Sequence, residues 1–178
     1  GTNIFRGHDN VQGATDVGPN PDSLPGYYGL AEGAFKHFAA AWKVDFEWIK
    51  KQYAPGMMGK PGMTVSRWID GVLEKNELID QDSNLRGQIF WGHAPNSQTR
   101  GLEMKRAMDK LDLLVVVDPY PSATAAMAAM PSAAGELNPN RAVYLLPAAT
   151  QFETSGSVTA SNRSVQWREK VIEPLFDS

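Results

Sequence analysis

The sequence predicts an α/β fold in which helices flank a parallel sheet. Three short apolar runs, at residues 88–91, 113–117 and 142–146, lack polar alternation, as strands buried on both faces do. Helix-compatible stretches at residues 99–111 and 122–130 separate these runs. Strand, helix, strand, helix, strand is the order of a parallel sheet with right-handed crossovers. We therefore expect a Rossmann-like, three-layer domain with a helical and loop-rich amino-terminal part.

The length of 178 residues predicts a single domain, 1–178, in which three parts differ in composition. Residues 1–30 are rich in Gly and Pro and show no sustained period of 2 or 3.6, which is typical of a loop. A loop of this length inside a compact domain is usually functional, so it is the first candidate for a site. Residues 31–80 form a helical part, and residues 85–178 form the α/β part.

Apolar side chains recur at helical spacing in the helical part. The first helix is expected around Phe38, and the second follows Asp45, which is suited to cap it. Pro55 and Gly56 are expected to break the chain. A third amphipathic helix opens at Thr64.

The composition excludes several classes of function. The formal net charge of −3 leaves no basic field that could hold nucleic acid or an anionic membrane surface. The absence of cysteine excludes disulfides, thiolate nucleophiles and cysteine-ligated iron–sulfur or zinc sites. The three histidines form no H-E-x-x-H pair, which disfavours a protein-ligated metal, and no apolar stretch approaches the ~18 residues of a membrane span. Because the sequence starts at Gly1 without Met, we expect a mature form or an excised fragment.

Two loops at the carboxyl ends of the predicted strands are candidate ligand sites, because ligands bind there in open parallel sheets. Residues 92–99 are polar, include Gly92 and precede a helix, which suits phosphate; an ordinary turn capped by Ser97 or Thr99 is the alternative. Asp118 ends the second strand, where it could accept bonds from a ribose or a guanine edge, or merely cap the next helix. Neither G-x-G-x-x-G nor a P-loop motif occurs, which disfavours a standard NAD enzyme.

Residues 6–13 gather groups that handle carboxylates. Arg6 can grip a carboxylate with two N–H donors, and each charge-assisted bond contributes about 1.5–3 kcal/mol. The imidazole of His8 can pass a proton. The alternative is that both side chains are simply solvated.

The opening string GTNIFRGHDNVQGATD, with LPGY at 24–27, resembles the catalytic (alpha) subunit of molybdenum- or tungsten-dependent formate dehydrogenases, members of the molybdopterin oxidoreductase family. Residues 91–95, 117–119 and 153–167 resemble the pterin-dinucleotide segments of that family, in the same order. The resemblance covers nearly the whole chain.

The resemblance implies a bis(molybdopterin guanine dinucleotide) cofactor (bis-MGD) with Mo or W, and oxidation of formate to carbon dioxide with two electrons leaving through iron–sulfur clusters. The catalytic Cys or selenocysteine and the cluster cysteines of the family have no counterpart here, so this chain ligates no cluster. We therefore expect an internal fragment of a larger subunit, inactive alone. Its partners would be formate, the rest of the alpha subunit and iron–sulfur electron-transfer subunits, without nucleic acid or direct membrane insertion. A periplasmic location is expected, with the cytoplasm as the alternative.

Site residues follow from the same resemblance. Arg6 resembles the arginine that orients formate, and His8 takes the neighbouring position, so these two are the expected catalytic residues. The family pattern is broken at Ala94, where many relatives have Asn or Asp, and at Ser155, where Glu is common. The expected cofactor-binding residues are Gly7, Gly92, His93, Asn96, Ser97, Gln98, Asp118, Ser122, Thr124 and Gly156.

Two other functions are the alternatives. A stand-alone nucleotide- or pterin-binding module without catalysis would use the Gly92 and Asp118 loops. A structural interaction domain would need neither. Exposed apolar patches are expected where further domains would normally cover aromatic side chains such as Trp91 and Trp167.

Overall fold

The computed structural model of the chain describes residues 6–18, 23–57, 63–64, 67–79, 81–93, 100–129 and 140–175. Its contacts divide the chain into two compact units. Unit 1 comprises residues 1–62 and 155–169, and unit 2 comprises residues 63–154 and 170–178. Unit 1 is therefore assembled from two segments that lie far apart in the sequence.

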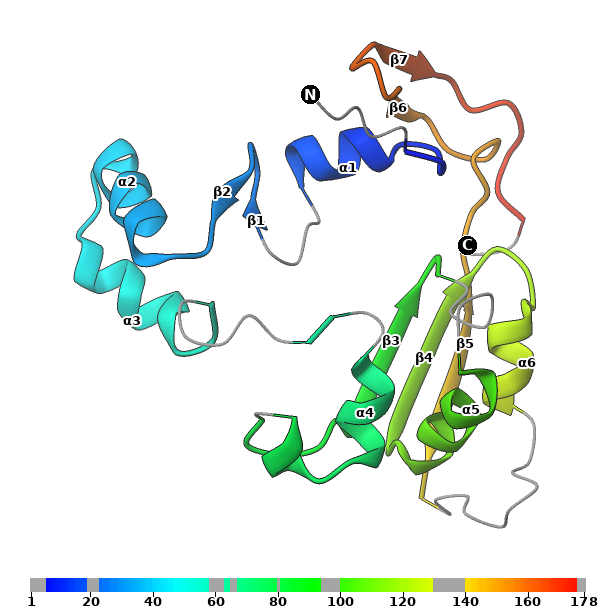
Figure 1. Cartoon of the computed structure of the whole chain (residues 1–178). Coiled ribbons are helices and arrows are strands. Elements are labelled where there is room, and N and C mark those ends of the chain that lie inside the picture. Colours follow the sequence, from blue (N-terminus) through cyan, green and yellow to red (C-terminus); the bar gives the residue numbers. More distant parts are fainter. Residues whose placement is uncertain are drawn as a thin grey trace. The chain divides into compact units, whose positions relative to one another are not determined.

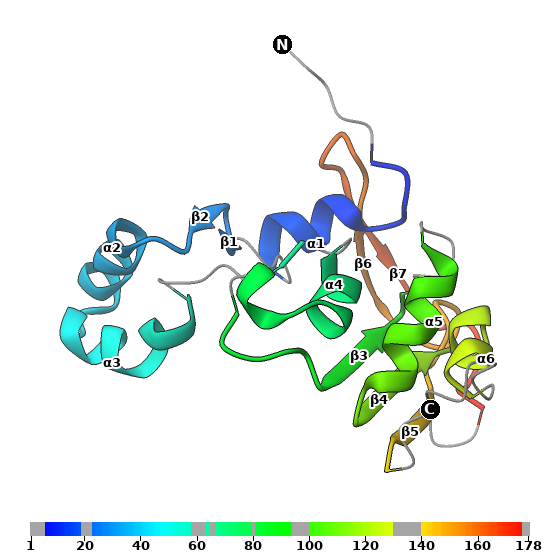
Figure 2. The ribbon, with the colours of Figure 1, turned by 60° about the horizontal axis from the view of Figure 1, so that its bottom comes forward.

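Unit 2 is built on a parallel sheet of three strands, in the order β3–β4–β5 (Figures 1 and 2). The strands are β3 (Gly87–Trp91), β4 (Leu113–Asp118) and β5 (Ala142–Pro147), and Val115 is paired with both Ile89 and Tyr144. α5 (Gly101–Lys110) lies between β3 and β4 in the chain, and α6 (Ala123–Ala129) lies between β4 and β5. The α/β class and all three strands are thus confirmed, with bounds within one residue of those expected.

Three helices cover one face of this sheet: α4 (Trp68–Leu73), α5 and α6 (Figure 1). A single 3₁₀ turn at Asn76–Leu78 follows α4. No helix in the described ranges is both long and apolar enough to cross a bilayer. The buried core consists of Trp68, Ile69, Val72, Phe90, Met104, Ala107, Met108, Leu111, Leu114, Val116 and Ala125.

The expectation that all three strands are buried on both faces is wrong for β3 and β5. Ile89 and Trp91 of β3 are 58% and 78% exposed, and Tyr144 of β5 is 55% exposed. The cause is that α4, α5 and α6 all pack on the face that carries Phe90 and Leu114, and no helix in the described part of unit 2 covers the face with the alternate side chains. The expected exposed apolar patch is therefore present.

Unit 1 contains the predicted pair of helices, α2 (Glu32–Trp42) and α3 (Phe46–Met57), which bury Phe35 and Ile49 in a second small core. Asp45 caps α3 as expected, since its Oδ2 accepts the Trp48 N–H at 3.1 Å. The expected break at Pro55 and Gly56 is wrong, because α3 continues to Met57. Pro55 has a φ that suits a helix but lacks the N–H that would bond the carbonyl four residues earlier, so it weakens this last turn without ending the helix.

The amino-terminal segment is not the continuous loop that its sequence predicts. It forms α1 (Val11–Val17) and a small antiparallel pair, β1 (Ser23–Leu24) with β2 (Tyr28–Gly29). α1 buries Gln12 and Gly13 rather than large apolar side chains, so it leaves no apolar period in the sequence. The remaining strands of unit 1, β6 (Gly156–Thr159) and β7 (Val165–Arg168), form an antiparallel hairpin.

Asp70 links α4 to the start of α5 in unit 2. Its Oδ1 lies 2.7 Å from Arg100 Nη2, and its Oδ2 lies 3.4 Å from Arg67 Nε. The hydrogen bond from Arg100 holds the pKa of Asp70 below its ordinary value, although burial opposes this shift. The folded state therefore gains stability from the ionised carboxylate.

We expect Asp70→Asn to lower the free energy of unfolding at pH 7 by about 1.5 kcal/mol, the low end for a hydrogen bond to a charged group, because Arg100 is partly exposed. A lowered folded pKa stabilises the fold above the unfolded value of about 3.9, and this stability is lost as the pH falls through the folded pKa. Urea unfolding should show the deficit at pH 7 and little of it at pH 3. Glu77→Gln, at an exposed carboxylate, is the control; an equal Asp70→Asn deficit at both pH values would contradict this account.

Candidate functional site

α1 docks onto the β6–β7 hairpin through a close approach at Gly13. A Cβ atom on Gly13 would lie 2.3 Å from Asn10 Oδ1 and 2.9 Å from Thr159 Oγ1. Asn10 Oδ1 accepts the Thr159 N–H at 3.0 Å, across 149 positions of sequence. Because no side chain fits between these groups, glycine at position 13 allows residues 6–10 to lie against β6.

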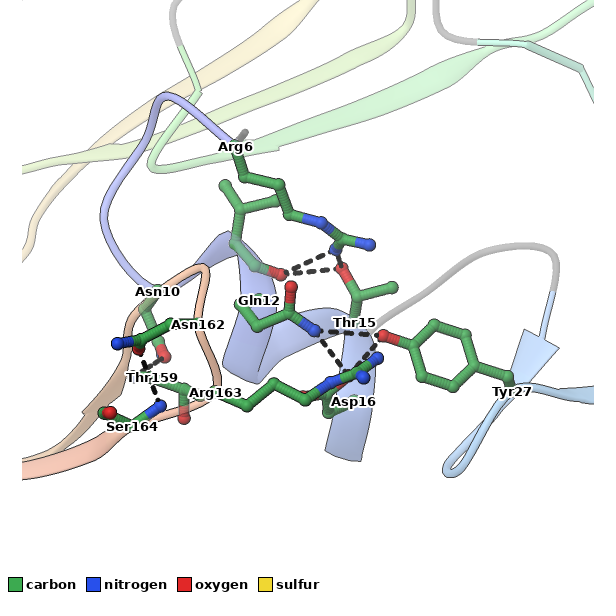
Figure 3. Close-up of polar contacts among 11 residues, drawn as sticks. Arg6, Asn10, Gln12, Thr15, Asp16, Tyr27, Thr159, Asn162, Arg163 and Ser164 are labelled. Carbon is green, nitrogen blue, oxygen red and sulfur yellow. Dashed lines mark hydrogen bonds and ion pairs between the residues drawn. The ribbon is translucent and has the colours of Figure 1, made fainter. Parts of the chain in front are cut away.

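A polar network around Asp16 connects α1 to two turns (Figure 3). Asp16 Oδ1 accepts hydrogen bonds from the Tyr27 hydroxyl and, at 2.8 Å, from Gln12 Nε2, and Oδ2 lies 3.6 Å from Arg163 Nε. The Tyr27 hydroxyl, followed by Gln12, holds the pKa of Asp16 below its ordinary value. Tyr27 and Arg163 both adopt positive φ, 65° in each case, so their turns are held in conformations that these residues rarely adopt alone.

Arg6 is anchored to the first turn of α1. Its Nη1 donates to Thr15 Oγ1 and, at 3.2 Å, to the Val11 carbonyl oxygen (Figure 3). Thr15 in turn donates its hydroxyl proton to the Val11 carbonyl oxygen at 2.6 Å. Arg6 is half-buried, whereas His8 is exposed. The guanidinium is therefore fixed by a helix, as a binding group must be.

A polar cavity of about 220 Å³ lies between the residues that precede α1 and the hairpin. It brings together the predicted Arg6, Gly7 and His8, and Arg168 of the hairpin also lines it. The two arginines outnumber the one lining carboxylate, Asp9, so the charge of the lining favours an anion, and a carboxylate matches the fork of a guanidinium. The lining is completed by Asp9, Asn10, Gln12, Val158, Thr159, Ala160, Ser161 and Gln166.

Unit 2 has a separate pair of cavities at the carboxyl ends of β4 and β5. The first, of about 210 Å³, is lined by the predicted Asp118 and by Tyr120, whose side chain is 69% exposed. Asp118 Oδ1 accepts the Tyr120 N–H at 3.1 Å, which shapes the turn after β4. The second cavity, of about 370 Å³, shares Tyr120 and adds Glu153. Open α/β sheets bind ligands outside the carboxyl ends of their strands, so these two cavities are candidate ligand sites.

Glu153 fixes the wall of the second cavity. It is buried, its Oε2 accepts the Thr150 N–H at 2.6 Å and its Oε1 accepts the Leu175 N–H at 3.2 Å. The backbone hydrogen bond from Thr150 holds the pKa of Glu153 below its ordinary value. Glu153 thus joins the loop after β5 to the carboxyl-terminal segment of unit 2.

The other predicted cofactor-binding residues are placed as follows. Ser122 Oγ accepts the Ala125 N–H at 3.5 Å at the start of α6, and Thr124 is fully buried. Gly92, at φ +56°, donates its N–H to the Val117 carbonyl oxygen at 2.8 Å. His93 follows it and lies beside the Phe90 ring. Neither Gly92 nor His93 lines the two cavities of unit 2 described above. Gly156 begins β6 in unit 1. The predicted Asn96, Ser97 and Gln98 lie outside the described residues.

Three residues of the sites are not identified by sequence reasoning: Arg168, Thr15 and Tyr120. A signal for Arg168 was present, because Gln166 and Arg168 alternate with Val165 and Trp167 and so share one face of a strand. Thr15 carries no such signal, since its role depends on the helix that places it beside Arg6. Within the described ranges, no three His, Asp or Glu side chains are gathered where they could hold a metal ion.

No protein-family model matches the chain. The chain is similar over 175 residues, 98% of its length, to several curated proteins named formate dehydrogenase. It is 29% identical to the F420-dependent formate dehydrogenase subunit alpha of Methanocaldococcus jannaschii, 27% to a formate dehydrogenase-named protein of Staphylococcus haemolyticus and 26% to one of Staphylococcus aureus. The chain spans 21%, 14% and 14% of the lengths of these proteins, respectively.

The matched region includes the Arg6 loop, the strand ends of unit 2 and the hairpin, because it extends over almost the whole chain. The resemblance visible in the sequence is thereby confirmed. The chain is similar to proteins named formate dehydrogenase and matches one stretch of these longer proteins.

Proposed function

We propose that this chain is part of the catalytic subunit of a formate dehydrogenase, in which it orients formate and holds part of a molybdopterin guanine dinucleotide cofactor. The observation that carries the proposal is the anchored Arg6 beside a polar cavity, within a chain that matches proteins named formate dehydrogenase over 98% of its length. The rest of the subunit and iron–sulfur electron-transfer subunits would complete the enzyme.

Arg6 would bind the carboxylate of formate. Its Nη1 is already used within α1, while Nε and Nη2 have no partner among the described residues. Two parallel N–H donors match the two oxygens of a carboxylate, and such bonds are charge-assisted. Oxidation of formate to carbon dioxide releases one proton and two electrons, and His8, exposed in the same cavity, would take up the proton.

The cavities of unit 2 support the cofactor part of the proposal. Asp118 Oδ2 has no partner in the described part of the chain, so it can accept bonds from a ribose hydroxyl or a guanine N–H edge. The exposed Tyr120 ring beside it can stack on a base. When bound, the cofactor supplies the molybdenum or tungsten centre at which the two electrons leave formate. The donor set of these strand ends fits the nucleotide end of that group.

In the full-length enzyme, we expect Arg6→Ala to raise the KM for formate and to lower kcat/KM by about tenfold or more, because at least one charge-assisted bond to the carboxylate is lost. Steady-state kinetics with varied formate measure this effect. Arg86→Ala, which removes an 81% exposed arginine side chain of unit 2, is the matched control and should leave both constants unchanged. An Arg6→Ala enzyme with wild-type kcat/KM would remove Arg6 from formate binding.

The second candidate function, a nucleotide-binding module without catalysis, rests on the same Asp118 cavity. For either function, GDP should bind saturably to the purified chain in calorimetry, and Asp118→Ala should weaken that binding by about tenfold, the value of one hydrogen bond to a charged group. Asp112→Ala, directly before β4 and so at its opposite end, is the control. Binding that survives Asp118→Ala would show that the nucleotide site lies elsewhere, and formate turnover by the full-length protein separates the two functions.

A further inference from the structure

The nitrogens of the Arg6 guanidinium differ in whether they already have a hydrogen-bond acceptor. Nη1 is engaged by two acceptors of α1, the Val11 carbonyl oxygen at 3.2 Å and Thr15 Oγ1. Nε and Nη2 have no acceptor among the described residues. These two nitrogens lie side by side on one edge of the guanidinium, and Nη1 is not part of that edge. The Nε/Nη2 edge is therefore the pair of parallel donors in which neither nitrogen is engaged by an acceptor of the described residues.

Thr15 has the correct hydrogen-bond polarity to hold Nη1. A hydroxyl has one proton to donate, and Thr15 gives it to the Val11 carbonyl oxygen at 2.6 Å. Its lone pairs are then left for the Arg6 N–H. The closed set formed by Arg6, Thr15 and the Val11 carbonyl fixes the rotation of the guanidinium about its long side chain (Figure 3).

We propose that Thr15 is a positioning residue for formate: by holding Nη1 of Arg6, it presents the Nε/Nη2 edge to the carboxylate. This inference rests on the proposed function of Arg6. Thr15 does not touch formate, so its loss leaves the charge of Arg6 in the cavity and removes only its orientation. The substrate class is the same carboxylate anion, and the bound geometry is a side-on, two-bond contact.

The packing of α1 does not depend on the Thr15 hydroxyl. The helix is held against the hairpin by the Asn10–Thr159 hydrogen bond and the close approach at Gly13, and against the turns by Asp16. Removing the hydroxyl alone should therefore leave the helix docked. This separates a positioning role from a merely structural one.

The test uses the full-length, cofactor-loaded enzyme with Thr15→Val, which keeps the shape and removes the hydroxyl, and Thr15→Ser, which keeps the hydroxyl. We expect Thr15→Val to raise the KM for formate about five- to tenfold with kcat changed less than twofold, and Thr15→Ser to restore the wild-type KM. In an Arg6→Ala background, Thr15→Val should add no further change, because the group that it orients is gone. Thr15→Ala replaces Thr15→Val if the latter does not accumulate as folded holoenzyme.

The outcomes separate this inference from the proposed function. If Arg6→Ala raises the KM but Thr15→Val leaves it unchanged, or if Thr15→Ser and Thr15→Val behave alike, the positioning role is overturned and Arg6 keeps its role. An effect of Thr15→Val that persists in the Arg6→Ala background also overturns it, because Thr15 would then act through another group. If Arg6→Ala itself has no effect on formate, the proposed function fails, and the inference fails with it.

Discussion

The close approach of α1 to β6 at Gly13 is the contact on which the candidate site of unit 1 depends. The Asn10 side chain accepts the Thr159 N–H across this contact, so residues 149 positions apart become neighbours. The same contact brings the Arg6 loop and the hairpin together around one cavity, which Arg6 and Arg168 both line. Neither segment could build that cavity alone, because each supplies one of its two walls.

Much of the fold follows from local sequence patterns. The three strands of unit 2 are predicted to within a residue because each is a short, continuous apolar run. α2 and α3 are predicted because apolar side chains recur at helical spacing in each, as Phe35 and Ala39 do in α2 and Phe46 and Ile49 do in α3. α1 could not be predicted in this way, since it buries Gln12 and Gly13 and has no apolar face. The exposure of Trp91 could not be predicted from the sequence either, because a continuous apolar run has the same pattern whether one or both faces of the strand are covered.

Some residues of the candidate sites can likewise be predicted from the sequence, and others depend on the tertiary fold. Arg6, His8 and Asp118 are recognisable from residue chemistry and from their place in a loop or at a strand end, and the structure places each at a cavity. Arg168 and Thr15 depend on which segments meet in three dimensions. Thr15 can be identified only from the structure, because the fold of α1 places its hydroxyl where it accepts a hydrogen bond from the Arg6 guanidinium. Tyr120 joins the cavities of unit 2 because the Asp118 turn directs the backbone there.

Hydrogen exchange of the Thr159 amide in Gly13→Ala tests the central contact most directly. Helix propensity alone predicts that Ala stabilises α1 by about 1 kcal/mol, whereas the close approach predicts the opposite, because the added Cβ would displace Asn10. We expect exchange at Thr159 to become about tenfold faster or more, with the Leu114 and Val116 amides of unit 2 unchanged, if the Asn10 bond protects the amide. Unchanged or slower exchange at Thr159 would show that α1 does not dock on β6 through Gly13, and the account of the cavity would be wrong.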